Sequence, residues 1–397
     1  GALVFVLPYR DEIRARPGTL HLHLRHAAAP APCTIQVAVE SDHHGSFGHL
    51  HQPAAVPEAG FAFQAPLGGS TDYWQPLDHA ATWSAWERHG LRRLEVKVFD
   101  LPPRTAVRLL ATFVPDPEPA APSLAWARPL ADPVALGERW ELAFDLDGLV
   151  ANPFDETATG LRLLVTPPDG REAAILPFLY QNFETFLVPG GEKIRPKGAK
   201  QFRARYRPTA TGTHHYRLVR EAGEGAAGQL LASGSFEVLP GRLPPFIRIS
   251  PRNPRYFETL DGRFFYPIGW NIAFPCDTPY GIAYLPYLPA GQSLATMRKM
   301  LEDLAASGGN CIRLWQSTWW NALEWGEGVD NYGGAGRYNL KNAWITDQVL
   351  DTCGRLGIHA LFTMQNHTRF FPQEWPQHPL NRRNGGFLRY SDEFWLE

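Results

Sequence analysis

This 397-residue sequence has few cysteines, no long hydrophobic run and no excess of either charge. Its 4 cysteines lie far apart, which excludes the close spacings of a zinc site and a dense disulfide framework. No run of about 18 apolar residues is present, so the sequence predicts no membrane-spanning helix. Lys and Arg number 38 against 40 Asp and Glu, and this near-neutral balance argues against a nucleic-acid partner.

The sequence also shows no basic start followed by an apolar core and a small-residue cleavage site. Residues 3–7 already have the pattern of a strand, so an export signal could have been removed or could lie upstream. The localisation therefore stays open between secreted, periplasmic and cytoplasmic, and a homo-oligomer stays open as well. We find no phosphate-binding loop and expect no cofactor and no metal.

Glycine and proline are abundant, at 36 each, and fall mostly before residue 295 between short runs of Val, Leu, Phe and Tyr. This sequence pattern is typical of antiparallel β domains. Alternating apolar residues at 19–24, 34–39 and 94–99 predict a first β-sandwich over residues 1–114, for which carbohydrate binding is one hypothesis. A Pro-rich linker is expected at 115–125, followed by an immunoglobulin-like β-sandwich at 126–240.

The pattern changes after a second Pro-rich joint at 240–245. Asp261-Gly262 predicts a hairpin turn, and helical periodicity over 293–306 and 341–356 alternates with apolar strands at 310–315 and 358–364. Strands that alternate with helices pair in parallel through right-handed crossovers, as in a doubly wound sheet or a (β/α) barrel. Residues 246–397 are therefore predicted to form an α/β unit.

Polar and aromatic side chains gather where these predicted parallel strands end, which is where both architectures place their chemistry. Aromatic rings cover the apolar C–H face of a sugar, and amide, guanidinium and imidazole groups bind its hydroxyls. The alternative is that individual tryptophans only pack the outer wall. The candidate sugar-binding residues are Trp270, Asn271, Trp315, Trp319, Trp320, Trp325 and Asn366.

Several motifs in this region resemble a known family. They are Phe265-Tyr266-Pro267-Ile268-Gly269-Trp270-Asn271, Asn310-Cys311-Ile312-Arg313-Leu314-Trp315, Tyr338-Asn339-Leu340, Gln365-Asn366-His367, and Asn381 with Asn384-Gly385-Gly386. Together they resemble the first part of a clan A glycoside hydrolase, a (β/α)8 TIM barrel, in the cellulase-like branch whose barrel follows a β-sandwich of unassigned function. The similarity covers residues 126–397. It implies one β-sandwich before the barrel. With the sandwich predicted from the strand pattern of residues 1–114, the expected fold is two antiparallel β-sandwiches followed by the first portion of a TIM barrel.

The resemblance implies retaining hydrolysis of a glycosidic bond in a poly- or oligosaccharide by two glutamates. Such a site holds its carboxyl groups about 5 to 5.5 Å apart. Arg313 matches the arginine beneath the nucleophile, where the alternative is a structural ion pair. His367 matches a histidine that contacts the sugar or the carboxylates, where the alternative is a core histidine. Both are expected to support the active site.

Neither catalytic glutamate is matched in this sequence. A whole barrel takes about 250 residues, so the chain is expected to hold three strands, with the glutamates beyond Glu397 in missing sequence or a second chain. Glu324 and Glu327 are the nearby carboxylates, and we expect them to shape the cleft. The alternative function is a non-catalytic carbohydrate-binding protein with the same aromatic cleft.

Histidines are concentrated in the first 51 residues. His21 and His23 would share one face of a strand, so two imidazoles could reach one metal ion. The simpler interpretation, which we favour, is a solvent-facing strand with histidine at its polar positions.

Overall fold

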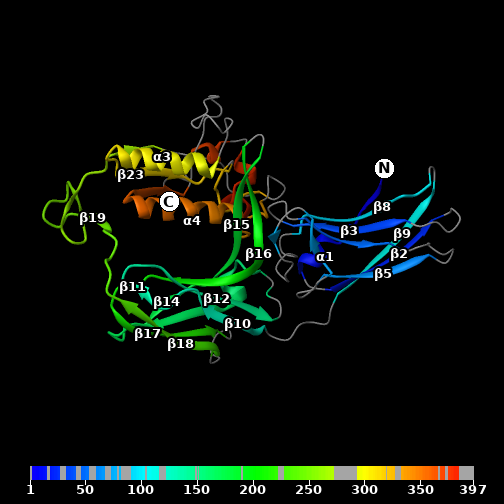
Figure 1. Cartoon of the computed structure of the whole chain (residues 1–397), viewed down its shortest axis with the longest axis horizontal. Coiled ribbons are helices and arrows are strands. Elements are labelled where there is room, and N and C mark those ends of the chain that lie inside the picture. Colours follow the sequence, from blue (N-terminus) through cyan, green and yellow to red (C-terminus); the bar gives the residue numbers. More distant parts are fainter. Residues whose placement is uncertain are drawn as a thin grey trace.

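The computed structural model shows a chain built mostly of β-strands in several antiparallel sheets, with few helices among the residues that it describes (Figure 1). The described residues are 2–15, 18–26, 33–41, 46–52, 60–67, 73–77, 80–81, 91–102, 105–115, 122–147, 150, 152–188, 191–221, 228–271, 293–318, 320–326, 332–364, 367–371 and 374–383. Within them, no helix combines the length and the apolar character needed to cross a membrane.

The first segment packs two antiparallel sheets over one core. One sheet has the order β1-β8-β3-β4-β6 and the other β5-β2-β9. Leu20, Leu22 and Leu24 alternate along β2 and share a buried cluster with Val37 and Val96 of the other sheet, as the period of a β-strand requires. The elements are β1 (Leu3–Val6), α1 (Arg10–Ala15), β2 (Gly18–His26), β3 (Thr34–Glu40), β4 (Ser46–His51), β5 (Phe61–Pro66), β6 (Gln75–Pro76), β7 (Ala80–Ala81), β8 (Arg93–Phe99) and β9 (Val107–Pro115).

The second segment contains two further sheets, each with five strands. Their orders are β10-β12-β16-β15, with β7 of the first segment added in parallel to β16, and β11-β18-β17-β13-β14. Trp140 is fully buried between them and stacks on Phe236 with ring centroids 4.0 Å apart. Both pairs of sheets are consistent with β-sandwiches. The elements are β10 (Ser123–Pro129), β11 (Val134–Ala135), β12 (Trp140–Asp147), α2 (Glu156–Thr159), β13 (Leu161–Thr166), β14 (Ala173–Ile175), β15 (Phe178–Val188), β16 (Gly191–Tyr206), β17 (Gly212–Arg220) and β18 (Gln229–Leu239).

A small antiparallel sheet, β19 (Ile247–Ile249), β20 (Phe257–Thr259) and β21 (Phe264–Phe265), follows the second segment. Gly262 takes a φ of 82° in the turn between β20 and β21, which confirms the predicted hairpin. Glu258 is buried in this sheet and accepts hydrogen bonds from Ser250, Arg248 and Arg252. The bond from Ser250, together with those from the two arginines, lowers the pKa of Glu258 in spite of its burial.

The last described part forms a parallel β-α-β-α-β unit, as the sequence predicts. Strand β22 (Gly269–Trp270) pairs with β23 (Cys311–Trp315), which pairs with β24 (His359–Thr363). Helix α3 (Leu294–Ala306) begins at its N-cap Ser293, and α4 (Leu340–Leu356) runs from its N-cap Asn339 to Gly357 at φ 70°. Three parallel strands begin a barrel and a doubly wound sheet alike. Short elements η3 (His367–Phe370), η4 (Trp375–Gln377) and α5 (Pro379–Arg383) follow.

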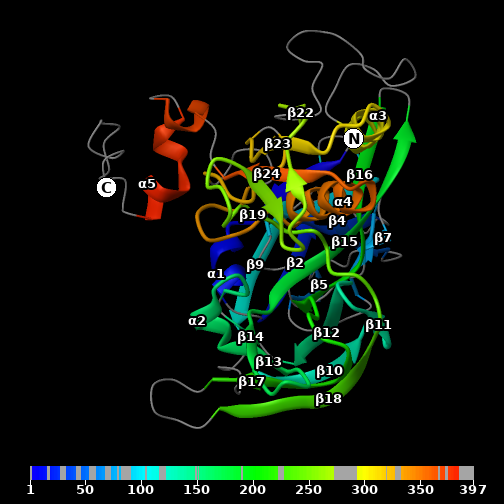
Figure 2. The same cartoon turned by 90° about the vertical axis from the view of Figure 1, so that its left-hand side faces the viewer.

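The second segment and the parallel unit share one continuous hydrophobic core. Residues of the β-sheets, such as Phe183, and residues of α3 and α4, such as Met297 and Trp344, belong to the same cluster. The rings of Phe183 and Trp344 lie 5.8 Å apart. The long β15–β16 hairpin reaches up to α3 and α4 (Figures 1 and 2). At its tip, the Glu192 carboxylate accepts a hydrogen bond from the backbone N–H of Leu294 at 2.6 Å, and so caps α3.

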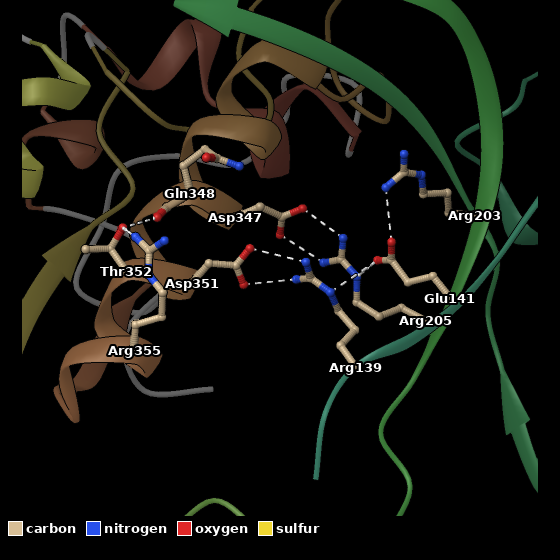
Figure 3. A network of polar contacts seen from close by, with 9 residues as sticks. All are labelled: Arg139, Glu141, Arg203, Arg205, Asp347, Gln348, Asp351, Thr352 and Arg355. Carbon is tan, nitrogen blue, oxygen red and sulfur yellow. Dashed lines mark hydrogen bonds and ion pairs between the residues drawn. The ribbon is translucent and has the colours of Figure 1, made fainter. Parts of the chain in front are cut away.

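A balanced ion-pair network fixes α4 against the sheet of β12 and β16 (Figure 3). Arg205 forms a bidentate pair with Asp347 at 2.8 and 2.9 Å, and Arg139 pairs with Asp351 one helical turn away. Glu141, which is buried, accepts from Arg203 and Arg205. Burial opposes the charge on Arg205, but the bonds and charges of Asp347 and Glu141 outweigh it and raise the pKa of Arg205. The network therefore carries three arginines against three carboxylates.

Candidate functional site

The two faces of the parallel sheet differ in what covers them. Ile312 and Leu314 of β23 are buried against α3 and α4, so the alternation of a strand turns the intervening side chains to the opposite face. We call this the open face. It carries Cys311, Arg313 and Trp315 from β23 and, by the register of the pairing, His359, Leu361 and Thr363 from β24.

Arg313 is exposed on the open face and is held by its neighbours at the carboxyl ends of the strands. Its Nε donates a hydrogen bond to the Thr363 hydroxyl at 3.3 Å, across the pairing of β23 and β24. Its guanidinium carbon lies 5.5 Å from the centre of the Trp315 ring. Guanidinium stays charged at any working pH and presents several donors in one plane, so it can bind a carboxylate or adjacent hydroxyls. The strand ends thus combine a fixed cation with an indole ring.

Strand β22 contributes less than β23 and β24 to the open face. Trp270 pairs with Ile312 in the register of β22 and β23, so its side chain lies on the helix side of the sheet rather than on the open face. Its ring is 39% exposed there. Asn271 follows the end of β22 and is exposed. The register therefore places Trp270 away from the face that holds Arg313, and the predicted role of Asn271 in the site stays a prediction.

The other predicted site residues are distributed more widely. Trp320 and Trp325 are 7% and 1% exposed and pack inside the protein. His367 begins η3, beyond the end of β24, and its side chain is outside the description. Trp319 and Asn366 lie outside the described residues. Of the predicted aromatic residues that are described, Trp315 is the one whose ring stands beside Arg313.

Hydrogen bonds fix the connection between β23 and α4. Asn342 donates to the carbonyl of Ala322 at 2.8 Å, and the Tyr332 hydroxyl donates to the carbonyl of Thr318 at 2.7 Å. The Glu324 carboxylate accepts from the backbone N–H of Gly336 at 2.6 Å. Glu324 therefore holds the backbone of this connection. Its predicted role in shaping a sugar cleft stays a prediction, and Glu327 lies outside the described residues.

A buried cation lies beneath this connection. The Arg369 guanidinium carbon stands 4.5 Å from the Trp325 ring centre, and the side chain donates to the Glu324 carbonyl at 2.9 Å. Burial lowers the pKa of Arg369 to about 10. Burial, with the charge of Arg369, lowers the pKa of His378 to about 4. His378 is therefore neutral at pH 7, and its Nδ1 accepts from the N–H of Leu380.

No group of three His, Cys, Asp or Glu side chains is arranged to hold a metal ion within the described part of the chain. His21 and His23 do lie on the same outward face of β2, as predicted. The Gln64 amide on the neighbouring strand donates to His21 Nδ1 at 3.3 Å. The two histidines therefore lie on a polar strand surface. Among the residues described, no third potential metal ligand is grouped with them.

No family model matches the chain, and no curated protein matches it. Among solved structures it is similar to a β-1,2-glucanase from Parabacteroides distasonis. The match has 12% sequence identity and a TM-score of 0.16, and it covers 57% of this chain and 28% of the glucanase chain. A TM-score of 0.16 is too low to establish a shared fold.

Proposed function

We propose that this protein acts on carbohydrate, and that the open face of β23 and β24 is part of a glycoside hydrolase site. The observation that carries the proposal is the position of Arg313 at the strand ends, bonded to Thr363 and beside the Trp315 ring. An indole ring next to a planar donor matches the two surfaces of a sugar, its apolar C–H face and its hydroxyls. The motif resemblance to clan A glycoside hydrolases points to the same class.

The proposal also accounts for the exposure of the open face. Parallel sheets are normally covered on both faces, yet Leu361 of β24, on the open face, is 60% exposed. We infer that this face is the inner surface of a (β/α)8 barrel, whose remaining strands come from a further polypeptide segment or a second chain.

Retaining hydrolysis requires two carboxylates about 5 to 5.5 Å apart. Strands β22, β23 and β24 carry no Asp or Glu. We therefore assign the acid/base and the nucleophile to the elements that complete the proposed barrel, and we assign Arg313 and His367 to supporting roles. Without those elements the same surface would act as a non-catalytic carbohydrate-binding site, which is the second candidate function.

Calorimetric titration of the full chain with neutral disaccharides tests the proposal. We expect measurable binding that falls at least about tenfold in Arg313→Ala and in Trp315→Ala, because each removes one of the two surfaces that hold the sugar. Reducing-end release from the same sugars separates the two functions, because only the hydrolase produces new ends. An absence of binding to every neutral sugar would contradict both functions.

A further inference from the structure

A groove of about 680 Å³ lies between the second β-sandwich and the chain that leads into α4. The connections β12–β13 and β14–β15 form one wall, with Phe154, Glu156 and Phe178. The other wall is the segment that ends in Tyr338. A volume of this size is in the range of small-molecule and oligomer sites in proteins. Of the lining residues, Tyr338 belongs to one motif of the resemblance, which assigns it no role in this groove.

The groove is lined by an exposed aromatic ring and by the acidic residues Asp155 and Glu156. Tyr338 is 40% exposed, and Phe154 holds its ring edge-on with centroids 5.7 Å apart. Glu156 is exposed, and the guanidinium of Arg162 lies 3.8 Å from its carboxylate. No Lys or Arg stands among the lining residues, all of which are described. A partly exposed ring beside acceptor oxygens suits a hydroxyl-rich ligand, and the negative charge disfavours an acidic one.

The two walls are fixed to each other before any ligand binds. The Asn152 amide donates to the carbonyl of Gly336 at 3.4 Å, which joins the walls directly. Arg205 stands 5.0 Å from the centre of the Phe178 ring and is also paired with Asp347 of α4 (Figure 3). The ion-pair network therefore holds one wall against the helix that carries the other. A preformed groove binds with a smaller cost in conformational entropy.

The groove also lies at the same end of the parallel unit as the open-face site. Tyr338 immediately precedes Asn339, the N-cap of α4. Because α4 follows β23 and runs back along the sheet, its first turn lies at the carboxyl end of β23, where Arg313 and Trp315 stand. The groove and the open-face site therefore share one end of the parallel unit, although α4 itself covers the opposite face of the sheet.

We propose that this groove is a second subsite for a neutral glycan chain, and that it extends the sugar site at the strand ends. The inference rests on the proposed function. The proposed substrate is a neutral chain of several sugars. A single sugar ring bound at Arg313 would not reach Tyr338, whereas a longer chain would contact both residues.

Titration of the full chain with a neutral disaccharide and a neutral hexasaccharide of the same linkage tests this subsite. We expect Tyr338→Ala to weaken hexasaccharide binding about tenfold and to leave disaccharide binding unchanged. Tyr338→Phe should retain most of the affinity, because it keeps the ring. Tyr256→Ala is the matched control, since Tyr256 is also exposed and has an edge-on partner, Phe264, at 5.7 Å. It should bind both sugars normally.

The outcomes separate the two proposals. If the chain binds both sugars and Tyr338→Ala behaves like the control, the groove is not a subsite, while the proposed function stands. If the unsubstituted chain binds neither sugar, the proposed function fails and the subsite with it. Equal affinity for a uronic acid hexasaccharide would contradict the preference for a neutral chain.

Discussion

Arg313 on β23 donates to the hydroxyl of Thr363 on β24, so the two neighbouring parallel strands hold one guanidinium at their carboxyl ends. The register pairs Trp315 with Thr363, which places the indole beside the same group. The sequence predicts Arg313 and Trp315 for this site but gives no indication of Thr363. The partner is set by the register between strands separated by about 50 residues of chain.

Arg313→Lys tests whether the planar guanidinium is needed, rather than a positive charge alone. A lysine keeps the charge but loses the fork of donors, so we expect disaccharide affinity between those of the unsubstituted chain and Arg313→Ala. Calorimetric titration measures the three affinities. Thr363→Val is the companion variant, which removes the positioning hydroxyl and leaves the charge. Equal affinities for the Arg313→Lys variant and the unsubstituted chain would show that charge alone is sufficient.

Asp347→Asn should lower the free energy of unfolding by about 1–2 kcal/mol, because it leaves Arg205 half-buried with a weakened partner. Asp351→Asn, one turn along α4, should cost less than about 1 kcal/mol, since its pair with Arg139 is more exposed. Urea unfolding of both variants gives the comparison. A larger loss for the Asp351 variant would contradict the central position of Arg205 in the network.

Gly269→Ala should destabilise the parallel sheet, because a Cβ at Gly269 would overlap the carbonyl oxygen of Cys311 on the paired strand. Gly354→Ala is the control: it lies inside α4, and its Cβ would meet nothing within 4 Å. That substitution should stabilise by about 0.5–1 kcal/mol through helix propensity. Thermal unfolding midpoints should therefore move in opposite directions. A harmless alanine at 269 would show that β22 does not approach β23 so closely.

Stability should decrease as the pH falls from about 6.5 toward 4, in part because of His378. Its pKa is lowered to about 4 in the folded protein, so the unfolded chain binds a proton first and unfolding takes up that proton. Protonation would also break the hydrogen bond from Leu380 to Nδ1. Unfolding midpoints from pH 7 to pH 4 should fall less steeply in His378→Asn. His215→Asn, on the exposed side of β17, is the control and should keep the original slope.

The local elements are predictable because local residues determine them. Ser293 and Asn339 cap the two helices, Gly357 ends the second, and apolar periodicity fixes which side of each helix is buried. The same reasoning predicts the parallel order of β22, β23 and β24. The first part of β16, residues 191–201, is not predictable as a strand, because its polar residues have no alternation that distinguishes them from a loop.

The burial of aromatic residues is not predictable in the same way. The sequence around Trp320 and Trp325 is rich in polar and aromatic residues, as expected for a sugar-binding cleft, yet both tryptophans are buried. A tryptophan has the same local signature whether it packs against Arg369 or faces a ligand. Only the long-range contacts decide between these positions.

The capping of α3 by Glu192, at the tip of the β15–β16 hairpin, has a consequence for truncated forms of the chain. Without the sheet that precedes it, α3 would lose this cap, and Met297 and Trp344 would lose apolar neighbours. Cleavage at the proline joint before residue 246 would therefore produce two poorly stable halves. The two parts are expected to unfold together as one cooperative unit.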